Sequence, residues 1–196
     1  MQDNVVLVSL NNQMQGVEDK IKAHQKGLLH RAFSIFIFSS TGNLLLQKRS
    51  DLKYHTPGLW SNTVCGHPKP HERLISAAHR RLREEMGFDC RLSKLFSFIY
   101  KAVFENFLTE YEYDTAFIGL FDEEPHPNSA EVAEYRWERL DQLQAQIRQK
   151  PEEYTIWLRI CMGHMKGMDG PLRILPERKD YLRAFNHKRR DLIPLI

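Results

Sequence analysis

A loop and a charged helix within Cys65–Phe88 constrain this sequence more than any other segment. A cysteine stands near a histidine in the order Val64-Cys65-Gly66-His67-Pro68, and Glu72 follows Gly66 after five intervening residues. Seven further residues lead to the run Arg80-Arg81-Leu82-Arg83-Glu84-Glu85-Met86-Gly87. Helices commonly end at a glycine in the left-handed conformation, so the sequence predicts a helix over Glu72–Met86 with Gly87 as its cap.

This spacing matches the Nudix signature, the loop and helix that hold divalent metal against a diphosphate, at every defined position except Arg81, where the signature has glutamate. Residues three and four apart share a helix face, so carboxylates at positions 81, 84 and 85 would converge on metal. Arginine replaces one of them with a fixed cation, and we expect diphosphate handling without water activation for hydrolysis. One magnesium ion can still bind Glu85, because phosphates and waters complete its octahedron.

Length and composition bound the class of protein. The chain has 196 residues, 42% of them hydrophobic and 11% aromatic, which is enough for one domain with a sizeable core. The net charge of +3 is modest, so it favours steering of an anionic substrate without demanding nucleic acid as a partner. We expect a monomer that binds a small-molecule diphosphate, with neither nucleic-acid nor membrane partners.

Membrane, export and disulfide signals are missing from the sequence. No apolar run reaches the roughly 18 residues that a membrane-spanning helix needs, and the beginning lacks a signal-peptide pattern. The prediction is a cytoplasmic protein. Cys65, Cys90 and Cys161 do not make a disulfide framework in a chain of this size. Cys90 and Cys161 are expected to be small buried apolar residues, whereas Cys65 differs because of its neighbours.

Hydrophobic patterning predicts an α+β fold with a mixed, antiparallel-rich sheet flanked by helices. A turn at residues 39–43 joins two apolar runs into a hairpin. The predicted strands are Val5–Leu10, Ala32–Phe38, Leu44–Lys48, Leu95–Phe104, Tyr111–Phe121 and Tyr135–Leu140. Besides the signature helix, the predicted helices are Asp141–Lys150 and Glu153–Met165, with a short helix or turn region at Val17–Lys26.

Three histidines and two glutamates are candidate metal ligands. Glu110 and Glu112 stand two apart in a predicted strand, so their side chains project from one face. Two carboxylates directed at an apolar interior are costly unless metal or protons compensate them. Imidazole together with carboxylate suits manganese, magnesium, iron or zinc rather than calcium. Four sites along the sequence offer ligands: His24, His30, Cys65 with His67, and the pair Glu110 and Glu112.

A single histidine is more often a satisfied surface or core residue than a ligand, which holds for His24 and His30 taken alone. The joint set is stronger, because His67 precedes the signature helix and the glutamates lie on a strand that can face it. The remaining histidines lack such neighbours and are assigned ordinary surface or core positions: His55, His71, His79, His126, His164 and His187.

Most of the chain resembles the type 1 isopentenyl-diphosphate delta-isomerase family, a Nudix-like group of isoprenoid synthesis. The likeness spans residues 20 to about 160, and its Cys-Gly-His-Pro element with the spaced histidines and the Glu-x-Glu pair is highly specific. The matching pieces are His24, Leu29-His30-Arg31-Ala32-Phe33-Ser34, Leu45-Leu46-Gln47-Lys48-Arg49-Ser50, Pro57-Gly58-Leu59-Trp60-Ser61-Asn62, Cys65-Gly66-His67-Pro68, Arg83-Glu84-Glu85-Met86-Gly87, Glu110-Tyr111-Glu112 and Trp157.

The resemblance implies interconversion of isopentenyl diphosphate and dimethylallyl diphosphate, by proton addition to the alkene and proton removal from the neighbouring carbon. It implies that the five-residue set binds one divalent ion, Mn²⁺, Mg²⁺ or Zn²⁺. Glu85, with the main-chain oxygen of Cys65, is implied to bind a Mg²⁺ that grips the diphosphate. Cys65 and Glu112 become the proton-transfer pair, and Tyr100 contacts the glutamate. The basic residues that match positions around the diphosphate are Lys20, Arg49, Lys53 and Arg83.

The chemistry of the implied reaction agrees with the residue types. Protonating an unactivated alkene gives a tertiary carbocation, which a desolvated aromatic face stabilises by about 2 kcal/mol. Trp157 is the candidate ring, and its alternative is an ordinary core tryptophan. Positioned acids and bases contribute about two to four powers of ten in rate. Cations on the diphosphate let remote binding energy orient the small tail.

Two other classes of function stay open on the sequence alone. A Nudix pyrophosphohydrolase acting on a nucleoside diphosphate derivative would release phosphate, and Arg81 argues against it. A nucleic-acid or protein-binding module would use the basic C-terminus with a decayed Nudix core, and the ligand set would then be an accident. For the signature segment itself, the alternative is an ordinary amphipathic helix with Glu84 paired to Arg80.

The predicted organisation is a Nudix-like isomerase domain over residues 1–166 followed by a basic C-terminal extension over residues 167–196. The extension matches nothing in the family resemblance. We expect it to pack on the same domain, although its composition also fits a flexible extension.

Overall fold

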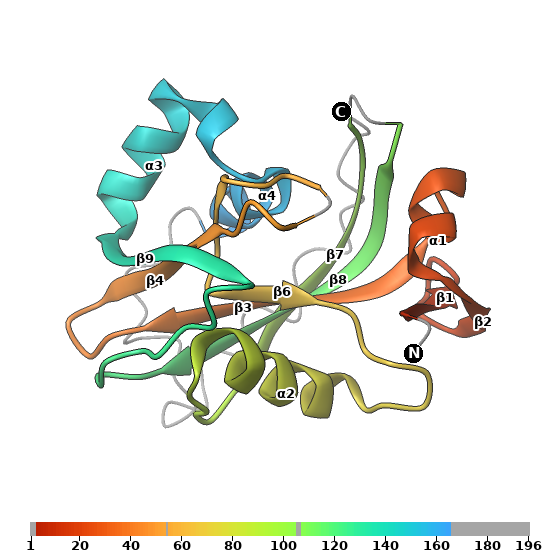
Figure 1. Cartoon of the computed structure of the whole chain (residues 1–196), viewed down its shortest axis with the longest axis horizontal. Coiled ribbons are helices and arrows are strands. Elements are labelled where there is room, and N and C mark those ends of the chain that lie inside the picture. The colour runs from red at the N-terminus through yellow and green to blue at the C-terminus, as the bar shows by residue number, and fades with distance from the viewer. Residues whose placement is uncertain (1–2, 54, 105–106, 166–196) are drawn as a thin grey trace.

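A mixed sheet with helices on both faces forms the centre of the molecule (Figure 1). The computed structural model describes residues 3–53, 55–104 and 107–165, so the predicted C-terminal extension lies outside the described residues. The strands are β1 Asn4–Val8, β2 Met14–Asp19, β3 His30–Phe38, β4 Asn43–Arg49, β5 Trp60–Ser61, β6 Val64–Gly66, β7 Ser93–Val103, β8 Thr109–Leu120 and β9 Val132–Arg139. The helices are α1 Lys20–Lys26, α2 Leu74–Met86, α3 Leu140–Gln149 and α4 Ile156–His164, with a 3-10 turn at Pro151–Glu153. Each of these helices is too short or too polar to traverse a lipid bilayer.

Strand β3 organises the sheet. It pairs in parallel with β8, from His30 opposite Glu112 to Phe38 opposite Leu120, and antiparallel with β1, β4 and β6. The other strand ladders among the described residues are antiparallel. This confirms the predicted α+β class with a mixed, antiparallel-rich sheet, and the predicted hairpin joins β3 to β4.

Hydrophobic cores lie on both faces of β3, because successive side chains of a strand alternate between faces. Phe36 and Phe38 pack on the face covered by α3 and α4. Phe33, Ile35 and Ile37 pack on the opposite face, against α2. All five side chains are buried. Burial on both faces explains why this segment reads as a continuous apolar run rather than an alternating one.

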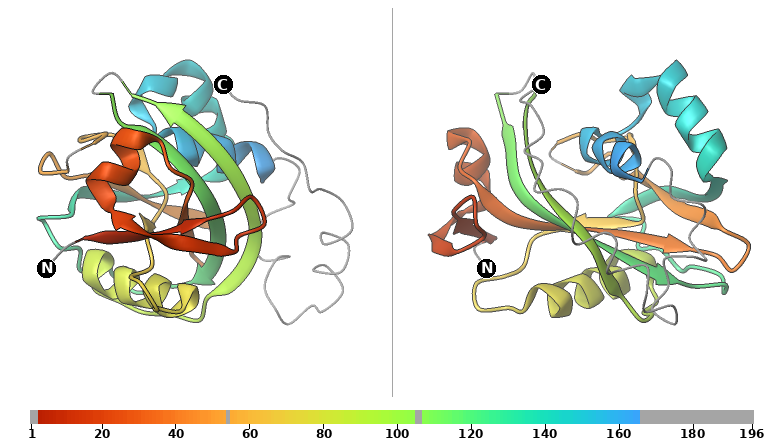
Figure 2. Two further views of the ribbon diagram at one scale, coloured as in Figure 1. Left: turned by 90° about the vertical axis from the view of Figure 1, so that its right-hand side faces the viewer. Right: turned by 180° about the vertical axis from the view of Figure 1, so that it is seen from behind.

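Strands β7 and β8 form a long antiparallel pair in which Tyr100 stands opposite Glu112. Figure 2 shows both strands strongly curved. The start of β8 lies against α1 and beside the first residue of β3. Segments that are far apart in the chain are therefore neighbours at this end of the sheet.

Besides the signature helix, two predicted helical segments differ from the observed ones by more than one residue. Residues 17–26, predicted as a short helix or turn region, split into the end of β2, paired with β1, and α1, whose N-cap is Asp19. The helix predicted from Glu153 begins only at Ile156. The backbone of Thr155 is extended there, and its N–H donates to the carbonyl of Trp60 in β5 at 2.9 Å. The helix therefore begins after Thr155.

The signature helix α2 ends at Gly87 as predicted, but it begins at Leu74 rather than Glu72. Glu72 belongs to a preceding turn, in which its N–H donates to the carbonyl of Lys69 at 3.0 Å and its carboxylate accepts from the N–H of Lys69 at 2.9 Å. Gly87 has a φ of +75°, in the left-handed region that favours glycine.

Gly87→Ala is expected to destabilise the fold by about 2 to 4 kcal/mol, because left-handed strain and a backbone clash act together. A Cβ atom at this position would stand 2.2 Å from the carbonyl oxygen of His126. Urea unfolding measures the loss. Gly163→Ala is the control: its Cβ would meet nothing within 4 Å, and a helix favours alanine over glycine. Equal free energies of unfolding for the two variants would contradict this account of the cap.

Candidate active site and metal centre

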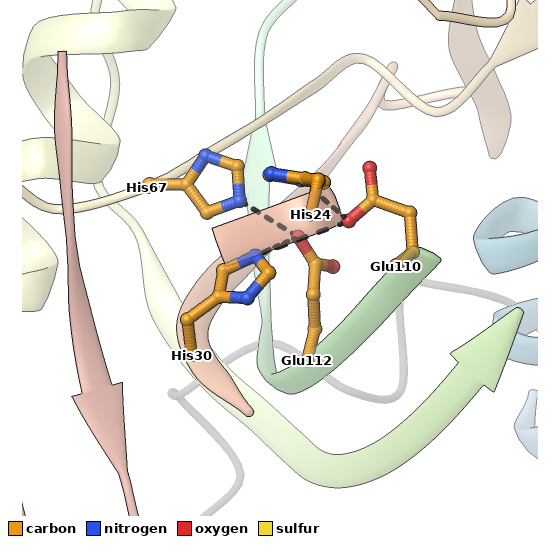
Figure 3. A group of neighbouring side chains, drawn as sticks. All are labelled: His24, His30, His67, Glu110 and Glu112. Atoms are coloured by element: carbon orange, nitrogen blue, oxygen red, sulfur yellow. Dashed lines mark hydrogen bonds and ion pairs between the residues drawn. The ribbon is translucent and has the colours of Figure 1, made fainter. Parts of the chain in front are cut away.

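Five side chains from separate parts of the chain converge at the start of β8 (Figure 3). One ligand atom of each lies within 4.8 Å of the others. They come from α1, the start of β3, the loop after β6 and β8 itself: His24, His30, His67, Glu110 and Glu112. His67 is partly buried and the other four are buried. The structure thus brings together the three histidines and two glutamates that the sequence offered as candidate metal ligands; Cys65 is outside this group.

Backbone geometry explains this convergence. His30 stands opposite Glu112 in the β3–β8 ladder, and Glu110 shares a face with Glu112 through the two-residue repeat of a strand. His24 Nδ1 donates to a backbone carbonyl of α1 at 2.6 Å, and His30 Nδ1 donates to the carbonyl two residues earlier at 2.8 Å. Both rings are fixed by these bonds with Nε2 near the carboxylates, as in metal-binding histidines.

Neighbouring imidazoles keep the two buried carboxylates ionised. Burial opposes the charge on Glu110, but His24 Nε2, 3.0 Å from Oε2, and His55 Nε2, 2.6 Å from Oε1, hold its pKa well below the usual value. Burial and the charge of Glu110 oppose ionisation of Glu112, yet its imidazole partners lower that pKa as well. Burial lowers the pKa of His67 to about 4, so its ring is neutral at pH 7.

The donor set fits a divalent metal ion. Among the described residues, His30 Nε2 is buried without a hydrogen-bond partner, and it lies 3.6 Å from Glu112 Oε1. Imidazole nitrogen and carboxylate oxygen together are ligands that manganese, iron and zinc accept. An ion held here would also compensate the two buried carboxylates, whose burial is otherwise costly.

His55 is a sixth residue at this cluster, and the sequence interpretation missed it. The prediction that His55 takes an ordinary position, away from the candidate ligands, is wrong. Its ring is buried and its Nε2 lies 2.6 Å from Glu110 Oε1. The ring centroid also lies 6.0 Å from those of Trp157 and Phe104. His55 belongs to the loop between β4 and β5, and no local pattern reveals where an irregular loop places a side chain.

A cavity of about 440 Å³ adjoins the cluster. Its size is that of a site for a small molecule. Cations, acids, a thiol and aromatic rings line it together, including Lys20, Arg49, Lys53, His55, Cys65, His67, Arg81, Tyr100, Glu110, Glu112, Glu131 and Trp157.

Cys65, Tyr100 and Glu112 share this cavity. Tyr100 Oη donates to Glu112 Oε2 at 2.6 Å and His67 Nε2 donates to Oε1 at 2.8 Å, so both carboxylate oxygens are held. Burial raises the pKa of the Cys65 thiol to about 12, and Arg49 Nη1 lies 3.7 Å from its sulfur. At pH 7 the thiol keeps its proton while the carboxylate is ionised. One cavity therefore contains a proton donor and a proton acceptor.

Trp157 is both a core residue and part of the cavity wall, the two alternatives that the sequence left open. The side chain is buried, and its Nε1 donates to Ser61 Oγ at 2.9 Å. The ring lines the cavity. The guanidinium carbon of Arg49 lies 5.4 Å from the ring centroid, a distance at which a cation is attracted to an aromatic face.

Of the four basic residues expected around a diphosphate, three line the cavity and one lies on the surface outside it. Lys20, Arg49 and Lys53 line the cavity. Arg83 does not: its side chain is 55% exposed and pairs with Asp89. Arg81 lines the cavity instead. Residues two apart on a helix point in different directions, so only one of these two arginines faces the cavity.

Arg81 also connects the cavity to Glu85, the expected magnesium ligand. Glu85 is buried, with Arg81 Nη2 2.5 Å from its Oε1 and Gln47 Nε2 2.9 Å from its Oε2. Arg81 Nη2 lies 3.2 Å from Glu131 Oε1, and Lys53 pairs with the other oxygen of Glu131. Arg81, which replaces the glutamate of the signature, thus links Glu85 to the ion pairs of Glu131 on the cavity wall.

Known proteins share this fold. The NUDIX domain model matches residues 28–158, so the chain belongs to the Nudix family. Solved structures with a similar fold include a protein from Deinococcus radiodurans, with TM-score 0.63, 21% identity and coverage of 75% of this chain and 90% of that one. A MutT protein from Methanosarcina mazei has TM-score 0.57, 18% identity and coverage of 69% and 91%. At these identities the likeness concerns the fold alone.

Relatives with higher sequence identity identify a family within the Nudix proteins. The chain is 55% identical over 169 residues to isopentenyl-diphosphate delta-isomerase 2 of Photorhabdus laumondii, covering 86% of this chain and 96% of that protein. It is 50% identical over 165 residues to isopentenyl-diphosphate delta-isomerase 1 of Aromatoleum aromaticum, covering 84% and 93%. Within the Nudix class, the chain belongs to the isopentenyl-diphosphate delta-isomerase family. The monomeric state and the cytoplasmic location stay predictions.

Proposed function

We propose that this protein interconverts isopentenyl diphosphate and dimethylallyl diphosphate. The observation that carries the proposal is the shared cavity of Cys65 and Glu112, which supplies a protonated thiol and an ionised carboxylate beside a set of candidate metal ligands. Moving the double bond requires one proton to be added to carbon and another to be removed. The names of the similar isomerases support the same reaction.

The cations of the cavity suit the diphosphate end of such a substrate. Ammonium and guanidinium groups donate charge-assisted hydrogen bonds to phosphate oxygens, and arginine does so with two donors at once. Glu131, paired with Lys53 and Arg81, would yield these partners to an incoming diphosphate. Binding energy at this end orients the small hydrocarbon tail for reaction. The proposed diphosphate-binding residues are Lys20, Arg49, Lys53 and Arg81.

At the tail, Cys65 and Glu112 would act as the acid–base pair. One of them gives a proton to the alkene and the other takes a proton from the neighbouring carbon, so the substrate gains no net proton. Each turnover therefore leaves one proton moved between the two groups, and the pair must be reset. Tyr100 holds the carboxylate through its hydrogen bond. The ring of Trp157 would stabilise the tertiary carbocation by about 2 kcal/mol if the two face each other.

The residues of the cluster fit one divalent ion: three imidazoles and two carboxylates would hold Mn²⁺, Mg²⁺ or Zn²⁺. The proposed second ion is Mg²⁺, held against the diphosphate by Glu85 and the main-chain oxygen of Cys65. Arg81 would first have to leave Glu85 Oε1 for the diphosphate, and phosphate and water oxygens would complete the shell of the ion. The charge of the ion in the cluster would adjust the acidity of the Glu112 carboxylate.

Hydrolysis of a diphosphate substrate fits this site less well than isomerisation does. In the Nudix signature a carboxylate stands at the position of Arg81. Here the guanidinium lies 2.5 Å from Glu85 and 2.8 Å from Glu84, so ion pairs occupy the two carboxylates that would share a metal-binding helix face with position 81. The site thus lacks the carboxylate cluster expected to activate water.

Purified protein supplied with Mg²⁺ and Mn²⁺ is expected to convert isopentenyl diphosphate to dimethylallyl diphosphate without releasing phosphate, because its cavity offers an acid–base pair rather than a water-activating cluster. Proton NMR in D₂O would follow the product methyl groups and the deuterium that enters them, while a colorimetric assay follows phosphate. Phosphate release from nucleoside diphosphate derivatives, with no isomer formed, would overturn the proposal.

A further inference from the structure

The two oxygens of Glu110 have different partners. Oε2 lies among the candidate ligands, 3.0 Å from His24 Nε2 and 3.9 Å from His30 Nε2. Oε1 lies 2.6 Å from His55 Nε2. A carboxylate only accepts hydrogen bonds, so His55 Nε2 carries the hydrogen and donates it. His55 lies outside the five-residue group whose ligand atoms gather within 4.8 Å.

Arg49 holds the loop that carries His55. Its Nη2 donates to the carbonyl of His55 and its Nε to the carbonyl of Thr56, both at 3.1 Å. Thr56 has a φ of +47°, a left-handed conformation that a β-branched residue adopts only when its surroundings impose it. The same guanidinium contacts the sulfur of Cys65 and the ring of Trp157. The position of the His55 ring is thereby tied to the reactive part of the cavity.

We propose that His55 is a positioning residue for the metal centre: by donating to Oε1 of Glu110, it keeps Oε2 as the single oxygen offered to the ion. Ligating carboxylates are oriented by such outer partners, whose loss weakens metal binding. Without the imidazole, the carboxylate is free to turn, and a buried oxygen loses its donor. This inference rests on the proposed metal centre, and it adds a residue that the family resemblance did not supply.

The test compares His55→Gln with His55→Asn. A glutamine amide reaches the place of the imidazole Nε2, whereas an asparagine amide reaches only the place of Nδ1. Co²⁺ is titrated into metal-free protein and followed by its visible absorption, which reports coordination as well as affinity. We expect His55→Asn to weaken Co²⁺ binding by about 10- to 100-fold and to change the band shape. His55→Gln should stay within about threefold of wild type, because its amide can donate to Oε1 of Glu110 from the place of the imidazole Nε2.

His79→Ala is the matched control. It removes another histidine–carboxylate contact, the 2.6 Å bond from Nδ1 to Asp89 Oδ1, outside the cavity lining. Its Co²⁺ affinity should equal that of the wild type. Thermal unfolding of the metal-free variants checks that they fold, and His55→Ala takes the place of His55→Asn if that variant does not.

Equal Co²⁺ affinity in wild type and His55→Asn would overturn the inference, as would equal losses in His55→Asn and His55→Gln, which would mark the imidazole as a ligand itself. Failure of the wild type to bind Co²⁺ would overturn both the metal centre and the inference. A wild type that binds Co²⁺ but forms no isomer would overturn the proposed function, while a selective loss in His55→Asn would still support the role of His55.

Discussion

Cys65→Ala should lower kcat for isomerisation by about 10³-fold, within the range that a positioned acid or base contributes. Alanine removes the thiol whose pKa, raised by burial to about 12, lets it hold a proton in the cavity at pH 7. The cations that would bind the diphosphate stay in place, so KM for isopentenyl diphosphate should change little. Product analysis by NMR over a range of substrate concentrations separates the two constants.

Cys90→Ala is the control for that experiment. Cys90 is also a free cysteine, and it lies outside the cavity lining, so kcat should stay within about twofold of wild type, as for a substitution away from the site. Thermal unfolding shows whether each variant keeps its fold. Wild-type kcat in a folded Cys65→Ala would remove Cys65 from the proposed mechanism.

Short-range patterns in the sequence predict several features of this site. The signature helix ends at Gly87 because a left-handed cap depends on one residue and its immediate neighbours. The placement of Glu110 and Glu112 on one face follows from the two-residue repeat of a strand. Such features need only short-range geometry, which the order of residues contains.

Long-range geometry explains what the sequence did not provide. The five candidate ligands meet because β3 pairs in parallel with β8, a pairing that no local pattern encodes; residue types and the family resemblance indicated the set without it. Arg83 matched a basic position by resemblance, yet the direction of α2 turns it outward and Arg81 inward. His55 reaches Glu110 from an irregular loop whose carbonyl groups accept hydrogen bonds from Arg49, and the order of residues does not encode that placement.

Glu112→Gln should lower kcat by about 10³-fold or more, because it removes the acid–base carboxylate. Glutamine has the same size but no negative charge. Its amide group also offers a donor where the carboxylate accepted from His67 or Tyr100, so one of these hydrogen bonds is lost. The steady-state assay used for Cys65→Ala measures the effect, and Glu134→Gln, on the exposed side of β9, should keep wild-type kcat.

Tyr100→Phe separates the chemistry of Glu112 from its positioning. Phenylalanine removes the 2.6 Å hydrogen bond to Oε2 but keeps the carboxylate, its charge and its contact with His67. The loss should therefore correspond to one charged hydrogen bond, about 10- to 100-fold in kcat. If Glu112→Gln and Tyr100→Phe lost the same factor, the carboxylate would be serving as a hydrogen-bond acceptor alone, and its proton-transfer role would be excluded. A loss at least tenfold greater in Glu112→Gln is what proton transfer by the carboxylate requires.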